Sequence, residues 1–231
     1  MRSYSQFGED LLLWRYFNAK TEGVFVEVGA NHPTLCSQTY FFESRGWHGI
    51  LVEPIPGNCE LLRQTRPKSQ VFQCALGRPD QRGTAQFYIS SGGNDVSGLA
   101  VNSGVVVERV VNVEVRTLDE VLAEAGNPQI DFISIDVEGW ELQVLEGFDL
   151  HRHRPAVLLV EDHLKQLSVH RHMARHGYRV VKRTGCNNWY IPRYDTFGLS
   201  TVLERMILFR KMYVSPWLRR TWKKLSRRKK D

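Results

Sequence analysis

Short apolar runs alternate with amphipathic segments along most of the chain. The runs are rich in β-branched side chains, which is typical of strands buried on both faces of a parallel sheet. The predicted strands cover residues 24–28 (VFVEV), 49–52 (GILV), 71–76, 130–135 (IDFISI) and 156–160 (AVLLV). The segments between them have helical periodicity, and the predicted helices cover residues 11–17, 37–45, 58–65, 117–125, 141–147 and 164–176.

A hairpin is predicted near the end of this pattern. Residues 178–183 and 188–191 flank the turn formed by residues 184–187 (TGCN). Together the segments predict an α/β fold with a Rossmann-like, doubly wound, mainly parallel seven-stranded sheet and an antiparallel strand at its C-terminal edge. Residues 84–89 alternate like a half-exposed strand. We predict one domain over residues 1–201, followed by a basic amphipathic tail over 202–231.

Acidic residues mark the ends of three predicted strands. They are Glu53, Asp136 and Glu161, and Glu27 lies within the first strand. Sheets of this class bind ligands outside the carboxyl ends of their strands, where the strand order reverses. We therefore expect the functional site at that edge.

The turn after the first strand reads Glu27-Val28-Gly29-Ala30-Asn31. Glycine and a small residue let the backbone approach a ligand closely. The turn lacks the GxGxxG pattern that places a pyrophosphate on a helix N-terminus. A ligand without phosphate, such as S-adenosylmethionine (SAM), fits it better, since an acid can accept from the SAM ammonium group. A purely structural tight turn is the alternative.

The next strand ends at Glu53, 26 residues after Glu27. An acid at this place can accept hydrogen bonds from both ribose hydroxyls of a nucleoside. A solvated residue at a strand end is the alternative. Ala75, at the end of the third predicted strand, is expected near the adenine ring.

A second acidic group follows the fourth strand, where Asp136, Glu138 and Glu141 occupy three of six positions. Such a group is costly unless it serves a ligand, a metal or a helix N-terminus. We expect Asp136 to face the cleft and Glu141 to serve the next helix. The fifth strand leads into Glu161-Asp162-His163, for which solvated strand-end positions are the alternative.

Several segments together resemble the FkbM family of SAM-dependent methyltransferases. They are SQFGED (5–10), FVEVGANHP (25–33), SQTYFFE (37–43), GWHGILVEP (46–54), TLDEVL (117–122) and IDFISIDVEGWELQVLEGF (130–148). The resemblance implies the class I SAM-dependent methyltransferase fold and methylation of a hydroxyl on a sugar or natural product. It also implies that the following residues line the SAM site: Gln6, Glu27, Gly29, Ala30, Asn31, Glu53 and Asp136. The role of His32 stays open.

Methyl transfer to a neutral hydroxyl benefits from a general base. Asp136 is the first candidate base or metal ligand, and Glu138, Glu161 and His163 are candidate helpers. Carboxylates with an imidazole suit Mg²⁺ or Mn²⁺. The spacing demands no metal, so we predict none.

Charge is concentrated at the C-terminus. Residues 202–231 hold eleven Lys or Arg against two acids, a net charge of +9, so the rest of the chain carries −3 of the total +6. Basic residues beside Trp217 and Trp222 suit an anionic membrane surface. A docked helix with a solvated end and a nucleic-acid contact are the alternatives, although no nucleic-acid recognition module accompanies the tail.

The remaining composition predicts a cytoplasmic protein. The four cysteines are scattered and predicted to be reduced, the N-terminus is acidic rather than apolar, and no apolar run reaches membrane-spanning length. Residues 90–104 (SSGGNDVSGLAVNSG) suit a lid over an acceptor or a plain surface loop. The leading hypothesis is a SAM-dependent O-methyltransferase of a cell-surface or lipid-linked saccharide, located in the cytoplasm or at the inner membrane face. A methyltransferase of a small natural product and a nucleic-acid-binding protein are the alternatives.

Overall fold

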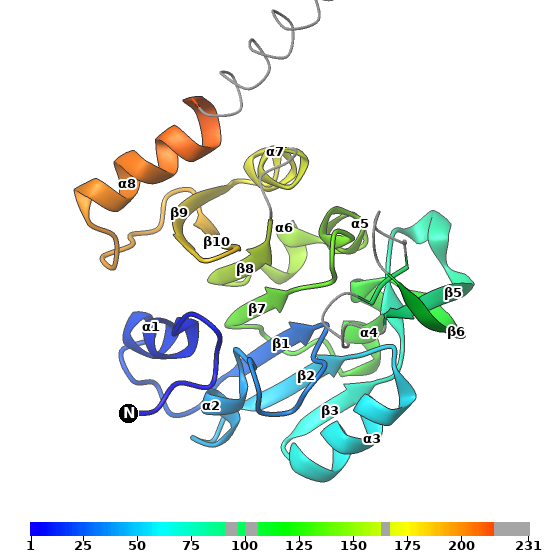
Figure 1. Ribbon diagram of the computed structural model, residues 1–231. Coiled ribbons are helices and arrows are strands. Elements are labelled where there is room, and N and C mark those ends of the chain that lie inside the picture. The colour runs from blue at the N-terminus through cyan, green and yellow to red at the C-terminus, as the bar shows by residue number, and fades with distance from the viewer. Residues whose placement is uncertain (91–96, 100–105, 163–166, 215–231) are drawn as a thin grey trace, which may run out of the picture.

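The centre of the molecule is a seven-stranded sheet (Figure 1). The computed structural model describes residues 1–90, 97–99, 106–162 and 167–214. The sheet order is β3-β2-β1-β7-β8-β10-β9. The strands are β1 (Val24–Val28), β2 (His48–Val52), β3 (Ser69–Phe72), β7 (Phe132–Ile135), β8 (Val157–Glu161), β9 (Tyr178–Thr184) and β10 (Asn187–Pro192).

The pairing confirms the predicted fold. Strands β3, β2, β1, β7 and β8 are parallel, while β10 is antiparallel to both β8 and β9, so the predicted hairpin forms that edge of the sheet. The strand order reverses between β1 and β7, because β1 pairs with β2 on one side and with β7 on the other. Ligand sites in open parallel sheets lie at such a reversal.

Helices cover both faces, so strand residues alternate between two apolar cores. Val26, Ile133 and Leu158 pack into one core, while Phe25 and Phe132 pack into the other, all without solvent exposure. The helices are α1 (Glu9–Tyr16), α2 (Tyr40–Glu43), α3 (Pro56–Thr65), α4 (Leu118–Glu124), α5 (Glu141–Glu146), α6 (Leu150–His153), α7 (Ser168–Arg175) and α8 (Val202–Phe209), with a 3₁₀ turn at Pro79–Gln81 and a π turn at Arg210–Val214. No helix in these described ranges is long and apolar enough to cross a bilayer.

The predicted strand over residues 71–76 was wrong. β3 ends at Phe72, and β4 (Ala75–Leu76) instead joins a second sheet of order β4-β6-β5. The expected half-exposed strand is β5 (Gly83–Ser90), and its partner β6 (Val107–Arg116) was not predicted. Most of the predicted lid at 90–104 lies outside the described residues, as do residues 164–166 of the predicted helix that contains α7.

Several histidines around α6 and α7 are partly buried, although they lie among arginines in the sequence. The ring of His153 stacks on Phe148 with a centroid separation of 5.2 Å. Burial lowers the pKa of His172 to about 4, with His176 as the next cause. These side chains therefore belong to the packing between the helices rather than to a solvated basic surface.

Candidate active site

A cavity of about 700 Å³ opens at the carboxyl ends of the parallel strands. The turns after β1, β2 and β7 form its wall together with the end of β8, the β9–β10 turn, β4, β5 and the N-terminal segment. It is lined by every predicted cofactor residue, namely Gln6, Glu27, Gly29, Ala30, Asn31, Glu53, Ala75 and Asp136. Glu138 and Glu161 line it as well, whereas His163 lies outside the described residues.

Gly29 allows β1 and β7 to approach each other at the point of strand reversal. Its φ is +81°, in the left-handed region that favours glycine. A Cβ at this position would collide with the backbone carbonyl oxygen of Asp136. The amides of Gly29 and Ala30 donate to the carbonyl of Val52, at 2.9 and 3.2 Å. This turn is therefore fixed against both neighbouring strands, which places Asp136 at the cavity.

Glu53 is held in one orientation at the end of β2. Its carboxylate accepts hydrogen bonds from the amides of Ile55 at 2.8 Å and Asn31 at 2.9 Å, and from the Asn58 side chain at 3.4 Å. Burial raises the pKa of Glu53, and these hydrogen bonds lower it. The side chain is 3% exposed, so the alternative of a solvated strand end is wrong.

Glu27 accepts more hydrogen bonds from the protein than the sequence indicated. Its carboxylate accepts from the Thr39 hydroxyl at 2.6 Å, the Gln38 amide at 3.1 Å and the Ser37 hydroxyl at 3.3 Å. The guanidinium of Arg66 lies 3.8 Å away. Burial raises the pKa of Glu27, and Arg66 is the largest influence lowering it. Glu27 thus secures the segment before α2 that forms part of the cavity wall.

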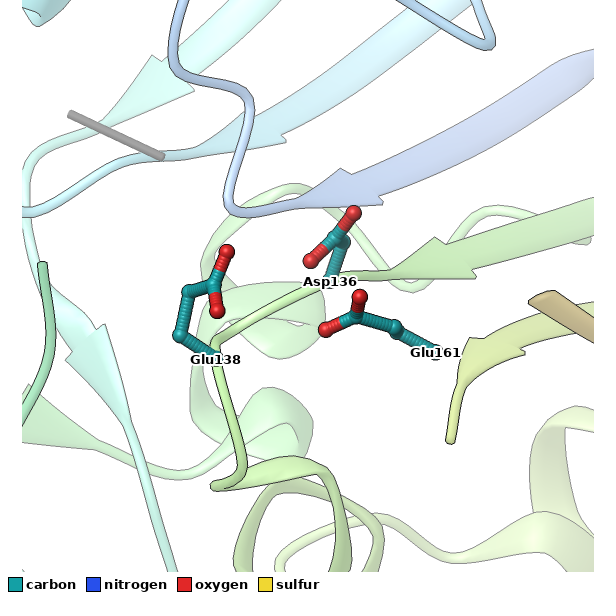
Figure 2. Close-up of side chains that lie close together, drawn as sticks. All are labelled: Asp136, Glu138 and Glu161. Atoms are coloured by element: carbon teal, nitrogen blue, oxygen red, sulfur yellow. The ribbon is translucent and has the colours of Figure 1, made fainter. Parts of the chain in front are cut away.

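Three carboxylates meet at the cavity, as Figure 2 shows. Asp136 and Glu138 come from the turn after β7, and Glu161 from the end of β8. One oxygen from each lies within 4.8 Å of the others. Glu138 has a φ of +56°, a conformation that is uncommon for a residue with a side chain and that recurs at functional sites.

Glu141 holds this turn in place, as expected for an acid in the first turn of a helix. Its Oε1 accepts from the Gly139 amide at 2.8 Å and from the Val137 amide at 3.4 Å. The side chain is buried, and burial raises its pKa. Glu141 therefore positions the segment that carries Glu138.

Burial and a neighbouring like charge make the carboxyl of Glu161 retain its proton more readily than a free carboxyl. Burial raises the pKa of Glu161, and the neighbouring Glu138 raises it further. The thiol of Cys186, which also lines the cavity, has its pKa raised to about 12 by burial and by Glu161. That thiol stays protonated at neutral pH and is no nucleophile.

The three carboxylates of Asp136, Glu138 and Glu161 could together hold a divalent cation, since carboxylate oxygens are ligands that Mg²⁺ and Mn²⁺ prefer. The absence of a metal stays a prediction.

Several lining residues were not predicted from the sequence. The Ser134 hydroxyl of β7 donates to Gln38, and both face the cavity. His32, whose role was open, uses Nδ1 to accept the amides of Thr34 at 3.1 Å and Leu35 at 3.0 Å. That nitrogen therefore stabilises the turn.

The family model described as "Methyltransferase FkbM domain" matches residues 27–180. The chain belongs to the FkbM methyltransferase family. It is a SAM-dependent methyltransferase, with SAM as its cofactor. No curated protein matches the chain at a significant level.

Solved structures with a similar fold include three methyltransferases. Precorrin-6y C5,15-methyltransferase from Geobacter metallireducens GS-15 is 9% identical, with 85% of this chain and 93% of that chain covered and a TM-score of 0.47. The METTL16 methyltransferase domain is 11% identical, with 84% and 71% covered and a TM-score of 0.48. A TehB-like methyltransferase from Corynebacterium glutamicum ATCC 13032 Kitasato is 10% identical, with 81% and 89% covered and a TM-score of 0.44. Similarities this distant carry no argument about substrate.

The cavity of this FkbM methyltransferase fits its cofactor. Glu53 presents a buried carboxylate on the strand next to the Gly29 turn, as a ribose site requires. Ala75 and Leu76 add apolar wall where an adenine ring needs van der Waals contact. A volume of about 700 Å³ lies within the range typical of sites for small molecules and cofactors.

Proposed function

We propose that this enzyme methylates a hydroxyl group of a saccharide. The observation that carries the proposal is the convergence of Asp136, Glu138 and Glu161 at the cavity. A neutral hydroxyl is a weak nucleophile, and a carboxylate within reach can accept its proton as the new bond forms. Adjacent carboxylates also suit an acceptor with several neighbouring hydroxyls, each of which donates a hydrogen bond.

Each residue has a distinct task in this proposal. When bound, SAM supplies an activated methyl group. Glu53 would hold the ribose hydroxyls, and Gln6 and Glu27 would lie at the methionine end. Asp136 accepts the proton of the acceptor hydroxyl, while Glu161, whose pKa is raised by burial and by Glu138, takes part in holding that proton. Alignment of the acceptor and exclusion of water account for most of the remaining acceleration.

The proposed acceptor is uncharged where it meets the enzyme. A phosphate-bearing acceptor such as RNA would have to approach three carboxylates, which opposes binding. A small natural product with a hydroxyl group remains the second candidate, because the same carboxylates would serve it. We place the enzyme in the cytoplasm, with residues 202–231 at the inner membrane face.

The test follows a labelled methyl group from SAM into the cell's saccharide, lipid-linked and small-molecule fractions, with identification by mass spectrometry. We expect the label on a saccharide oxygen, and a loss of turnover of about 10²–10⁴-fold in Asp136→Asn. Glu60→Gln, an exposed carboxylate on α3, is the matched control and should leave turnover unchanged. Label confined to a small non-saccharide product, or near-normal turnover of Asp136→Asn, would overturn the assignment.

Removal of metal tests the predicted absence of a cation. Because the proposed base is a carboxylate, dialysis against a chelator should leave turnover unchanged. Loss of turnover that Mg²⁺ restores would instead assign the three carboxylates to a metal.

A further inference from the structure

Helix α8 turns its apolar side away from the protein. Successive residues of a helix are about 100° apart, so Val202, Leu203, Met206 and Phe209 lie on one side, and Phe209 at its margin also lines a hollow with Val181 and Phe197 of the domain. Their exposed fractions are 73, 66, 64 and 60%. Leu208, on the opposite side, is the buried residue of this helix. A surface helix of a globular protein normally turns its larger apolar side toward the core and leaves its polar side in water.

The outward orientation is fixed by polar contacts to the domain. The buried Lys182 of β9 forms an ion pair with Glu204 of α8 at 2.5 Å and donates to the carbonyl of Leu199 at 3.2 Å. Thr201 caps the helix and exchanges hydrogen bonds with the same Glu204. Rotation of α8 to bury its apolar side would leave the ammonium of Lys182 buried without its carboxylate, which is strongly unfavourable.

The charge beside this surface decides what can cover it. Arg210 and Lys211 follow the apolar side directly. Residues 215–231 add eight more basic residues, with Trp217 and Trp222 among them and one acid, Asp231. Apolar side chains next to clustered cations and interfacial tryptophans match the boundary between acyl chains and anionic headgroups.

We propose that the outward side of α8 docks this enzyme on an anionic lipid membrane. Two other occupants fit less well. A second copy of the chain would place one segment of charge +9 against another, and like charges in contact oppose association. RNA would satisfy the cations but leave the apolar residues of α8 in water. The proposal does not depend on which acceptor the enzyme methylates.

The docking surface and the cavity lie in different parts of the molecule. In Figure 1, α8 extends beside β9 at one edge of the main sheet, well separated from β5 and β6. Phe87 of β5 lines the cavity. Contact of α8 with a bilayer therefore does not involve the β5 side of the cavity.

The test is flotation of the full chain with vesicles of phosphatidylcholine alone or with about 30% phosphatidylserine. We expect binding to the anionic vesicles only, and a reduction of about tenfold or more in Met206→Glu/Phe209→Glu. Leu61→Glu/Gln64→Glu, on exposed positions of α3, adds the same two charges and should bind like the wild type. SAM affinity and the melting temperature are measured for each variant, so that a folding defect is recognised.

Three outcomes would overturn the proposal. The first is no difference between the two kinds of vesicle, and the second is equal binding by Met206→Glu/Phe209→Glu with its fold intact. The third is a wild-type dimer in sedimentation that the same variant dissociates while vesicle binding persists, which would assign the surface to a second copy. Failure of methyl transfer to saccharide would leave the lipid result untouched, so the two proposals fail separately.

Discussion

Arg66 does not line the cavity, but its removal should lower the stability of the fold sharply. Its side chain is fully buried, and its Nε contacts Glu43 at 2.5 Å. The guanidinium also donates to Thr39 Oγ1 at 2.9 Å and to the carbonyl of Pro33 at 3.1 Å, and lies 3.8 Å from Glu27. Arg66→Met retains most of the volume and removes the charge, so two buried carboxylates lose their cation.

The size of the stability loss depends on the hydrogen-bond donors that the two carboxylates keep in Arg66→Met. Removal of one partner from a buried ion pair costs about 3–5 kcal/mol. Glu43 still accepts from the Lys68 amide at 3.0 Å and the Ser69 hydroxyl at 2.5 Å, and Glu27 keeps its own donors. We therefore expect a loss near the lower end, about 3 kcal/mol in the free energy of unfolding. At about 2–4 °C per kcal/mol, the melting temperature should fall by about 6–12 °C.

The dependence on pH separates this reasoning from a simple packing defect. Burial raises the pKa of Glu27, and Arg66 is the largest influence that lowers it, so Arg66→Met should raise this pKa further. A carboxyl with a folded pKa above its unfolded pKa stabilises the fold at low pH, and this contribution is lost as pH rises through the folded pKa. The deficit of Arg66→Met should therefore be smaller in mild acid than at neutral pH.

Urea denaturation across that pH range measures the stability deficit, and separate calorimetric titration with SAM measures cofactor binding. Arg63→Met, at an exposed arginine of α3 three residues earlier, should change stability by no more than about 0.5 kcal/mol. Arg66→Met should also weaken SAM binding, because residues 36–38 line the cavity. A deficit below about 1 kcal/mol, or one that does not vary with pH, would refute the assignment of Arg66 as the counter-charge.

Three further predictions concern the cavity. Glu53→Ala should weaken SAM binding by about one to two orders of magnitude, since hydrogen bonds to a charged group contribute about 1.5–3 kcal/mol, and unchanged calorimetric affinity would contradict the ribose assignment. Turnover should rise with pH through the raised pKa of Glu161, and Glu138→Gln should move this rise to lower pH by removing a like charge; an unchanged pH profile would show that Glu138 does not act on Glu161. Gly29→Ala should destabilise the protein by about 1–3 kcal/mol because of its φ and the nearby Asp136 carbonyl, whereas Gly57→Ala, where a Cβ meets no atom within 4 Å, should be neutral in chemical denaturation.

The main sheet could be predicted because each of its parallel strands is recognisable from its own local sequence. Runs such as 24–28 and 130–135 are apolar throughout, and each ends at a turn residue or an acid. The second sheet was missed for a different reason. β6 alternates with valines at 111, 113 and 115, but several of its outward positions are polar (Glu108, Asn112 and Glu114), and the segment lacks a continuous apolar run. β4 has two residues, and its separation from β3 depends on pairing with β6, which is 40 residues distant at Val115.

The cavity was predicted as far as strand ends define it. Acids at the ends of parallel strands must share one edge of the sheet, so Glu53, Asp136 and Glu161 could be placed together from the sequence. Cys186 could not be placed, because it reaches the cavity through the β9–β10 turn. The contact between Gln38 and Ser134 joins residues 96 positions apart and leaves no local pattern.

The sequence alone does not separate an acid that supports the fold from one that takes part in the reaction, and the surroundings of each carboxylate in the structure add what is missing. Glu27 and Glu141 accept amides or hydroxyls from segments that they hold in place, so their carboxylates are engaged in the structure. Asp136 and Glu138 are half-buried and lie beside a third carboxylate, an arrangement that opposes folding through like-charge repulsion. Proteins retain such an arrangement where a proton from a ligand, or a cation, neutralises the repulsion. We therefore propose that Asp136 and Glu138 take part in the reaction and that Glu27 and Glu141 support the fold.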